Sequence, residues 1–415
     1  CMWIQKLSFP LVLIFLGLSC APQNIQTQDP PSTQPPFERL WSAIDSLERI
    51  AFFREALDST QVVLNYAKQN NAPQHIVKSL IYQSNYIQQI EEQGSERALR
   101  LLDSALLWVE GPEKAILQSL TAQGYLSYFR ARRHLISSLT ESNMEVPDDL
   151  RLWTAGQLLE RVHELFEASL DHDFLRTTPV GQFEEIIDTS ADAWAAPTIY
   201  DVLARKALAF YQTDEALVTR PAERFYIENE AALAPARDFV NASFETADSQ
   251  SHQLKTLRLY QDLIRFHLAD DDPRALLLAD MSRLEYCHRN GIIANADSLY
   301  LHALTTIENS QSGQPLSGVA AWYRAQYYFS RGATNKNGGD DENGNFAKAM
   351  DICEKVISRF PNSWGAQKCR NLRKSIMRKS LDFSCETVVS PDKPFLISVR
   401  YRNIDSLALR MYRVT

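Results

Sequence analysis

The stretch from Phe346 to Val414 reads FAKAMDICEKVISRFPNSWGAQKCRNLRKSIMRKSLDFSCETVVSPDKPFLISVRYRNIDSLALRMYRV, and it decides the fold. Within it a helical pattern of period 3.6 gives way to a strand pattern of period 2. The helical stripe consists of Phe346, Ala349, Cys353, Val356, Ile357 and Phe360. We expect Asn345 to cap the start of this helix, and Pro361-Asn-Ser363 to end it.

A second helix is predicted from Trp364 to about Lys379. Its apolar positions, three and four residues apart, are Ala366, Cys369, Leu372 and Ile376. Because only a short break separates the two helices, they should pack as an antiparallel helical hairpin.

Beyond Leu381 apolar and polar residues alternate, which is typical of strands with one apolar face. The apolar positions are Ile397, Val399 and Tyr401, and then, after a polar turn at 403–406, Leu407, Leu409 and Met411. We therefore predict a β-hairpin between these two runs. A lone two-stranded hairpin is marginally stable in water, so we expect residues 381–415 to begin a β-domain that continues in a longer protein.

Composition excludes several classes of protein. The 415 residues are 45% hydrophobic and 10% aromatic, enough for a substantial core and two domains. The net charge is −8, and Lys and Arg are spread along the predicted helices, which argues against nucleic acid as a partner. Only 14 glycines are present, which fits helices joined by tight turns.

The first 20 residues have the parts of a secretory signal. Lys6 precedes an apolar run from Leu7 to Leu18, and small residues lead to Cys20. We predict a lipoprotein signal peptide over 1–20 with lipidation of Cys20; the alternative is a signal followed by an unmodified cysteine. Residues 21–37 are rich in Gln, Pro, Ser and Thr and predict a disordered tether. The protein is thus expected to be exported and lipid-anchored to the cell envelope, at the periplasmic face of the outer membrane.

Residues 38–380 are predicted to form one helical domain. The segment Ser95 to Val109 shows the periodicity best, with Ala98, Leu102, Ala105 and Val109 on one stripe. Similar units recur at irregular spacing, which favours a degenerate tetratricopeptide-like solenoid over a regular array. The expected loops are 145–149, 213–222 and the Gly- and Asn-rich segment 335–345.

Six cysteines are present: Cys1, Cys20, Cys287, Cys353, Cys369 and Cys385. Cys353 and Cys369 each lie eight residues from Pro361, so they should face each other across the helical hairpin. A disulfide there would contribute about 3 kcal/mol in the chain-entropy model. The alternative is a pair of buried free thiols. Cys287 and Cys385 have no evident partner.

Nothing in the sequence predicts an enzyme, a cofactor or a metal site. The eight histidines are scattered, and His172 and His267, each near aspartates, are more typical of surface or capping groups than of ligands. The 335–345 loop lacks the spacing of a calcium-binding loop. The motifs HExxH, GxSxG and GxGxxG and the phosphate-binding loop do not occur. We expect a binding or structural protein.

Several segments in order give the chain a family resemblance. The downstream ones are 353–369, 394–404 and 409–414; the upstream ones are Trp41 with Asp45-Ser-Leu47, 75–82, Thr178-Pro179, 200–208 and 259–263. Together they resemble the bacterial alpha-2-macroglobulin family, in the lipoprotein branch where a helical, tetratricopeptide-like region precedes the first macroglobulin β-domains.

The resemblance implies an endopeptidase inhibitor that protects the cell envelope, with proteases as partners of β-domains downstream of this sequence. Some relatives trap proteases through a bait segment and a Cys-Gly-Glu-Gln thioester; Cys385-Glu-Thr387 is not that motif. The helical region would then serve as a spacer or a docking module.

Two other functions compete with this one. A glycan-binding lipoprotein of the starch-utilisation type also joins a lipid anchor to tetratricopeptide-like helices. It would need exposed aromatic platforms, whereas we expect five tryptophans in periodic segments to be core residues: Trp108, Trp153, Trp194, Trp322 and Trp364. The other function is a helical-repeat scaffold for envelope assembly, whose partners would be envelope proteins.

Overall fold

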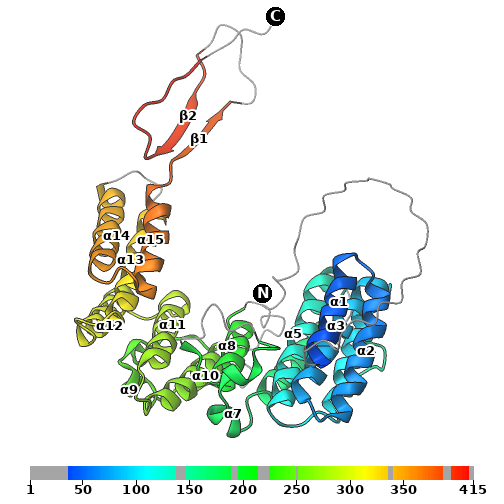
Figure 1. Ribbon diagram of the computed structural model, residues 1–415. Coiled ribbons are helices and arrows are strands. Elements are labelled where there is room, and N and C mark those ends of the chain that lie inside the picture. Colours follow the sequence, from blue (N-terminus) through cyan, green and yellow to red (C-terminus); the bar gives the residue numbers. More distant parts are fainter. Residues whose placement is uncertain are drawn as a thin grey trace, which may run out of the picture. The chain divides into compact units, whose positions relative to one another are not determined.

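The computed structural model describes residues 36–136, 146–187, 195–213, 224–248, 251–334, 340–386 and 394–410. These residues are mostly helical, and one small two-stranded antiparallel sheet lies near the C-terminal end (Figure 1). The expected mostly helical fold with a short β segment is therefore confirmed. The predicted signal peptide, Cys20 and residues 21–35 of the tether lie outside the described residues. Among the helices that are described, none combines the length and the apolarity that crossing a bilayer requires.

The described residues divide into two compact units. Unit 1 takes those up to Phe225 and those from Glu245 to Leu263. Its helices are α1 (Pro36–Arg49), α2 (Phe53–Gln69), α3 (Pro73–Ile90), α4 (Gly94–Leu106), α5 (Gly111–Ile136), α6 (Ala155–Ala168), α7 (Phe174–Thr177), α8 (Ile199–Tyr211) and most of α10 (His252–His267). Each helix from α1 to α5 packs on the next one in the chain.

Local sequence explains where the unit 1 helices begin. Thr154 caps α6, and its side chain accepts a hydrogen bond from the Gln157 backbone while the Gln157 side chain accepts one from the Thr154 backbone. Thr198 and Asp201 form the same reciprocal pair at the start of α8. Each pair satisfies backbone N–H groups that a helix start leaves unpaired. The helix expected over 95–109 is confirmed as α4, with Ala98, Leu102 and Ala105 buried.

Unit 2 takes the described residues from Tyr226 to Phe244 and from Ile264 onward. Its elements are α9 (Ala236–Phe239), α11 (Arg274–Asn290), α12 (Ala296–Ser310), α13 (Ser317–Thr334), α14 (Asp340–Arg359), α15 (Trp364–Met377), β1 (Ser380–Cys385) and β2 (Ile397–Arg402). The predicted helical domain, 38–380, thus contains helices of both units, and its boundaries stay a prediction.

Helices α14 and α15 form the predicted helical hairpin and lie beside α13 (Figure 1). The three share one core cluster of small and aliphatic side chains: Ala321, Ala325, Ala349, Ile352, Cys353, Val356, Ala366, Cys369, Leu372 and Ile376. Ser363 ends the break between α14 and α15, and its hydroxyl accepts a hydrogen bond from the Ala366 backbone N–H at 3.1 Å.

The start of α14 differs from the prediction. The helix begins at Asp340, so Asn345 lies inside it and is not its cap. The loop expected over 335–345 is wrong for 340–345, and 335–339 lies outside the described residues. The added start of the helix leads into Phe346, whose ring packs edge to face on Phe329 of α13 at 5.6 Å.

The predicted β-hairpin between 397–401 and 407–411 is wrong in its second strand. Strand β2 pairs with β1, in the register Ser380 with Arg402 through Cys385 with Ile397. Residues 407–410 are not part of a strand, and 411–415 lies outside the described residues. Strand β1, which was not predicted, itself alternates Leu381, Phe383 and Cys385 with polar residues, and this period-2 signal could have identified it.

Candidate functional site

The two strands carry a one-sided apolar surface. In an antiparallel pair, directly opposed residues project from the same face of the sheet. Three opposed pairs are apolar, and we call their residues the apolar hairpin face: Leu381 with Tyr401, Phe383 with Val399 and Cys385 with Ile397. The three intervening pairs are polar: Ser380 with Arg402, Asp382 with Arg400 and Ser384 with Ser398.

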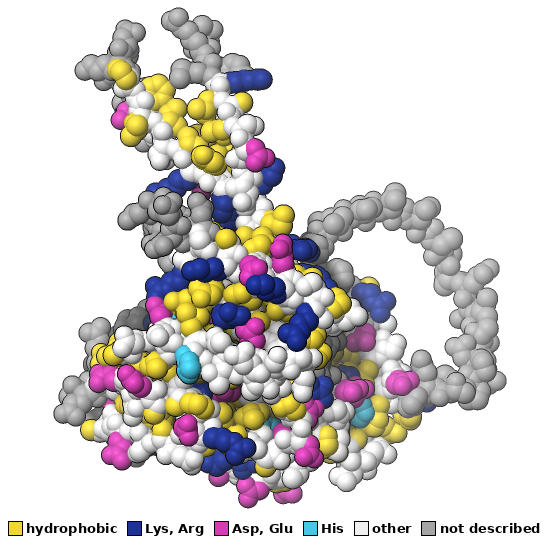
Figure 2. Space-filling model, turned by 90° about the vertical axis from the view of Figure 1, so that its left-hand side faces the viewer, with side chains coloured by type: hydrophobic (Ala, Val, Ile, Leu, Met, Phe, Trp, Pro, Cys, Tyr) yellow, Lys and Arg dark blue, Asp and Glu magenta, His cyan; other side chains and the backbone are white. Residues whose placement is uncertain are grey.

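In the described part of the chain no element covers the apolar hairpin face. Phe383 is 72% exposed and Tyr401 66%, and Leu381 and Ile397 are exposed as well. Figure 2 shows hydrophobic side chains gathered over these strands at the top of the view. Phe395 and Leu396, just before β2, are also exposed. Contiguous exposed apolar residues typically mark a surface that another part of a protein covers.

The base of the hairpin is fastened to the end of α15. Arg402 donates a hydrogen bond to the Ser375 carbonyl at 2.8 Å, and its guanidinium lies 5.4 Å from the centre of the Phe346 ring. Asn403 has a left-handed backbone, with φ of 54°, and its amide donates to the carbonyls of Ile376 and Arg378. These bonds hold the chain just after β2 at the end of α15.

The structure brings Cys353 and Cys369 together. Both are fully buried free cysteines in the core of the helical hairpin. The Cys369 thiol donates a hydrogen bond to the Cys353 sulfur, and this bond raises the pKa of Cys369 and lowers that of Cys353. The expected proximity is therefore confirmed, while the disulfide itself stays a prediction.

Cys287, Cys385 and the two singled-out histidines do not share a site with the Cys353 and Cys369 pair. Cys287 is buried, and burial raises the pKa of its thiol to about 12, whereas Cys385 is exposed. His267 is buried and contacts Asp270 at 2.6 Å, and His172 stacks on Phe174. Among the described residues there is no group of three or more His, Cys, Asp or Glu side chains that could hold a metal ion.

The tryptophans divide between core and surface. Trp153 stacks on Tyr125, and Trp322 meets Trp364 edge to face at 5.5 Å; all three tryptophans are half-buried. Trp194 lies outside the described residues. The expectation that Trp108 is a core residue is wrong, because it is 42% exposed. The Lys68 ammonium lies 3.8 Å from the centre of the Trp108 ring and takes one of its faces, which leaves a poor platform for a sugar.

Comparisons of the chain with protein-family models, with curated proteins and with solved structures find no match.

Proposed function

We propose that this chain is the helical head and the first strands of a larger, membrane-tethered protein of the alpha-2-macroglobulin type, which inhibits endopeptidases and protects the cell envelope. The helices, in this proposal, form a degenerate tetratricopeptide-like solenoid that acts as a spacer or docking module. The lipid on Cys20 holds it to the membrane, and the inhibitory step belongs to β-domains that follow this sequence.

The apolar hairpin face is the observation that carries the proposal. One face of β1 and β2 is wholly apolar and the other wholly polar, which is the pattern of strands in a β-sandwich, where the apolar face packs on a second sheet. Such a face gains stability only when it is buried, at about 25 cal/mol per Å² of apolar surface. Strands that follow in the same polypeptide are the natural cover, because they are present at a high effective concentration.

The order of elements supports the same proposal. Helix α15 ends at Met377 and β1 begins at Ser380, so the change from helix to strand takes place within a few residues. The hydrogen bonds from Arg402 and Asn403 to the end of α15 fix the base of the hairpin against the last helix. The helical region would thus present the first β-domain on a firm base.

An inhibition assay with the complete protein tests the function. The complete reading frame that contains this chain is expressed, incubated with a panel of endopeptidases, and assayed with a large protein substrate and with a small chromogenic peptide. Entrapment predicts strong loss of activity on the large substrate and little loss on the peptide. Full activity on both substrates for every protease would overturn the inhibitor function.

The same clone tests the structural part independently. Limited proteolysis should release a β-rich fragment whose N-terminus lies near Ser380, because the proposal places a domain start there. A reading frame without further strand-rich sequence would contradict the proposal even if some inhibition were measured.

A further inference from the structure

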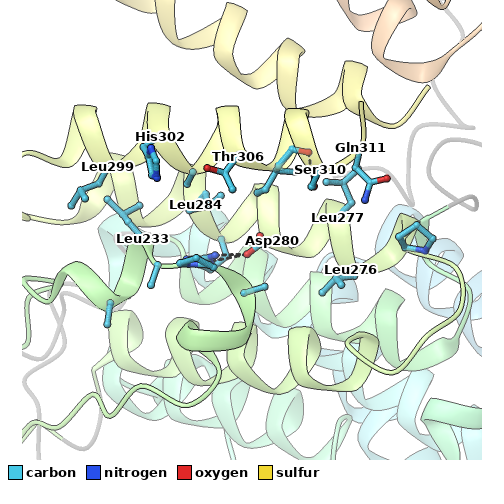
Figure 3. Close-up of a pocket in the computed structure, with 18 of the residues that line it drawn as sticks. Leu233, Leu276, Leu277, Asp280, Leu284, Leu299, His302, Thr306, Ser310 and Gln311 are labelled. Atoms are coloured by element: carbon cyan, nitrogen blue, oxygen red, sulfur yellow. Dashed lines mark hydrogen bonds and ion pairs between the residues drawn. The ribbon is translucent and has the colours of Figure 1, made fainter. Parts of the chain in front are cut away.

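Unit 2 encloses a cavity of about 510 Å³ between α11, α12 and the segment 230–236, which holds a 3-10 turn and the start of α9 (Figure 3). Its walls are mainly aliphatic, and the side chains include Leu233, Leu276, Leu277, Leu284, Leu299 and Ile307. The residues described as lining it include no Phe, Tyr or Trp. The volume falls within the range of small-molecule sites, roughly 300–1,000 Å³, and the walls suit a flexible aliphatic group rather than a sugar ring.

One buried ion pair interrupts the apolar wall. Asp280, 5% exposed, accepts hydrogen bonds from Nε and from a terminal nitrogen of Arg283, both at its Oδ1 atom. Arg283 is fully buried; its other terminal nitrogen donates to the Ala232 carbonyl at 2.7 Å, and its guanidinium lies 4.5 Å from the centre of the Phe239 ring. The positive charge is thus matched within the protein.

The second oxygen of this carboxylate distinguishes the cavity from a simple packing defect. Among the described residues, no hydrogen bond reaches Asp280 Oδ2, although Asp280 lines the cavity. Oδ2 is not one of the fully buried polar atoms, so solvent in the cavity can donate to it. A ligand that displaces this solvent must bring a donor of its own to keep the hydrogen bond.

The ion pair also selects the charge of the ligand. Asp280 and Arg283 together are neutral, so a cationic ligand would leave an unbalanced charge in an apolar site. An anionic ligand would in addition be repelled by the carboxylate. The other polar lining side chains, Glu230, His302, Thr306, Ser310 and Gln311, are at exposed or half-exposed positions, where solvent reaches them and screens the charge of Glu230.

We propose that this cavity binds a neutral aliphatic molecule with one hydroxyl group, whose chain lies among the leucines and whose O–H donates to Asp280 Oδ2. The inference is independent of the proposed inhibitor function, because every residue that carries it lies between 230 and 311. An aliphatic side chain of a partner protein is the competing occupant, and it would not require the hydroxyl.

The test compares three probes of equal chain length on the full chain by isothermal titration calorimetry: 1-octanol, octanoate and octylammonium. We expect 1-octanol to bind at least tenfold more tightly than either charged probe, because a charged head group would lose its hydration in the apolar cavity. Equal affinity for octanoate would overturn the selection for a neutral hydroxyl. The absence of any binding heat from 1-octanol up to its solubility limit would overturn the site. It would favour a protein side chain as the occupant.

A pair of variants locates the bound probe. Ala303→Leu adds side-chain volume inside the cavity on α12, whereas Ser298→Leu adds the same residue to an exposed position of α12 that does not line the cavity. Ala303→Leu should weaken 1-octanol binding at least tenfold, and Ser298→Leu should leave it unchanged, with circular dichroism confirming that both variants are folded. Equal binding by the two variants would place the probe elsewhere and overturn the proposal.

Discussion

Unit 2 contains two successive amphipathic hairpins that differ in whether another element covers the apolar face. The helical hairpin of α14 and α15 and the β-hairpin of β1 and β2 each have one apolar face and one polar face. The first buries its apolar face against α13, while the second leaves Phe383 72% exposed. An amphipathic pattern thus fixes which side is apolar, and a partner decides whether that side stabilises the fold.

The difference is also one of packing precision. In the helical hairpin, small residues let the helices approach closely: Gly365 of α15 lies against the backbone of Gly318 at the start of α13. In the β-hairpin the apolar side chains are opposed across the two strands, and such pairs contribute roughly 0.2–1 kcal/mol each. Substitutions in the two hairpins should therefore have unequal effects on the free energy of unfolding.

The largest effect is expected for Leu372→Ala. Leu372 lies in the core cluster of α13, α14 and α15, so truncation leaves a cavity and should lower the free energy of unfolding by about 2–5 kcal/mol. Urea denaturation followed by tryptophan fluorescence, to which Trp322 and Trp364 beside the cluster contribute, measures it. Leu409→Ala, at an exposed position after β2, is the matched control and should change the free energy by less than about 0.5 kcal/mol. Similar losses in both variants would remove the contrast between the hairpins.

The second effect concerns the bond predicted between Cys353 and Cys369. If it forms in the oxidised protein, a reductant should lower the free energy of unfolding by about 3 kcal/mol, the chain-entropy estimate for a loop of this size. The Cys369→Ala variant cannot form the bond and should show no dependence on reductant. Mass spectrometry after alkylation without reduction gives a direct readout, and full alkylation of both thiols in the unfolded, non-reduced chain would contradict the bond.

The third effect is steric. A Cβ at Gly365 would lie 2.5 Å from the backbone of Gly318, so Gly365→Ala must push α15 away from α13. Overpacking of this kind costs about 1–3 kcal/mol. Gly344→Ala in α14 meets nothing within 4 Å and, in a helix, should instead raise stability by up to about 1 kcal/mol. Thermal melts of the two variants should therefore shift in opposite directions, and a common direction would show that the close approach is not needed.

Sequence patterns predicted the helical hairpin well because its signals are local. The break at Pro361 and the stripe that contains Cys353 and Cys369 depend on residues close in the chain, and packing on α13 agrees with them. The pairing of β2 was predicted wrongly although β1 has its own period-2 pattern, because 407–411 offered a nearer alternating run. The bonds from Asn403 to the end of α15, about 25 residues away in sequence, have no such local signal. Trp108 was misjudged because its periodic segment ends at Leu106, just before it.

The apolar hairpin face and the cavity could likewise be predicted from the sequence only in part or not at all. Alternation in β2 indicated an apolar strand face, yet the residues that complete that face, in β1, were missed. The cavity was invisible in the sequence because its walls combine Leu233, Leu284 and Leu299, which come from three separate segments. Burial of Asp280 beside Arg283 follows only from that tertiary arrangement.

The smallest effect on stability is expected for Phe383→Ser, and it probes the apolar hairpin face directly. A side chain that is 72% exposed loses little burial on truncation, so the free energy of unfolding of this chain should change by less than about 0.5 kcal/mol. Binding of an apolar fluorescent dye should nevertheless fall, because the variant removes the most exposed ring of the face. Asp382→Ser, on the polar face of the same strand, should leave dye binding unchanged.

The same variant behaves differently if more strands are present. In a protein that continues beyond Thr415 and covers the face, Phe383 would be a core residue, and Phe383→Ser should then cost several kcal/mol, about as much as a large-to-small core substitution. The comparison of the short and the long protein therefore measures how much of the apolar face is covered. If Phe383→Ser lowers the free energy of unfolding by less than about 0.5 kcal/mol in both proteins, the downstream strands leave the face open. The β-hairpin would then remain exposed, and the helical hairpin buried, in the longer protein as well.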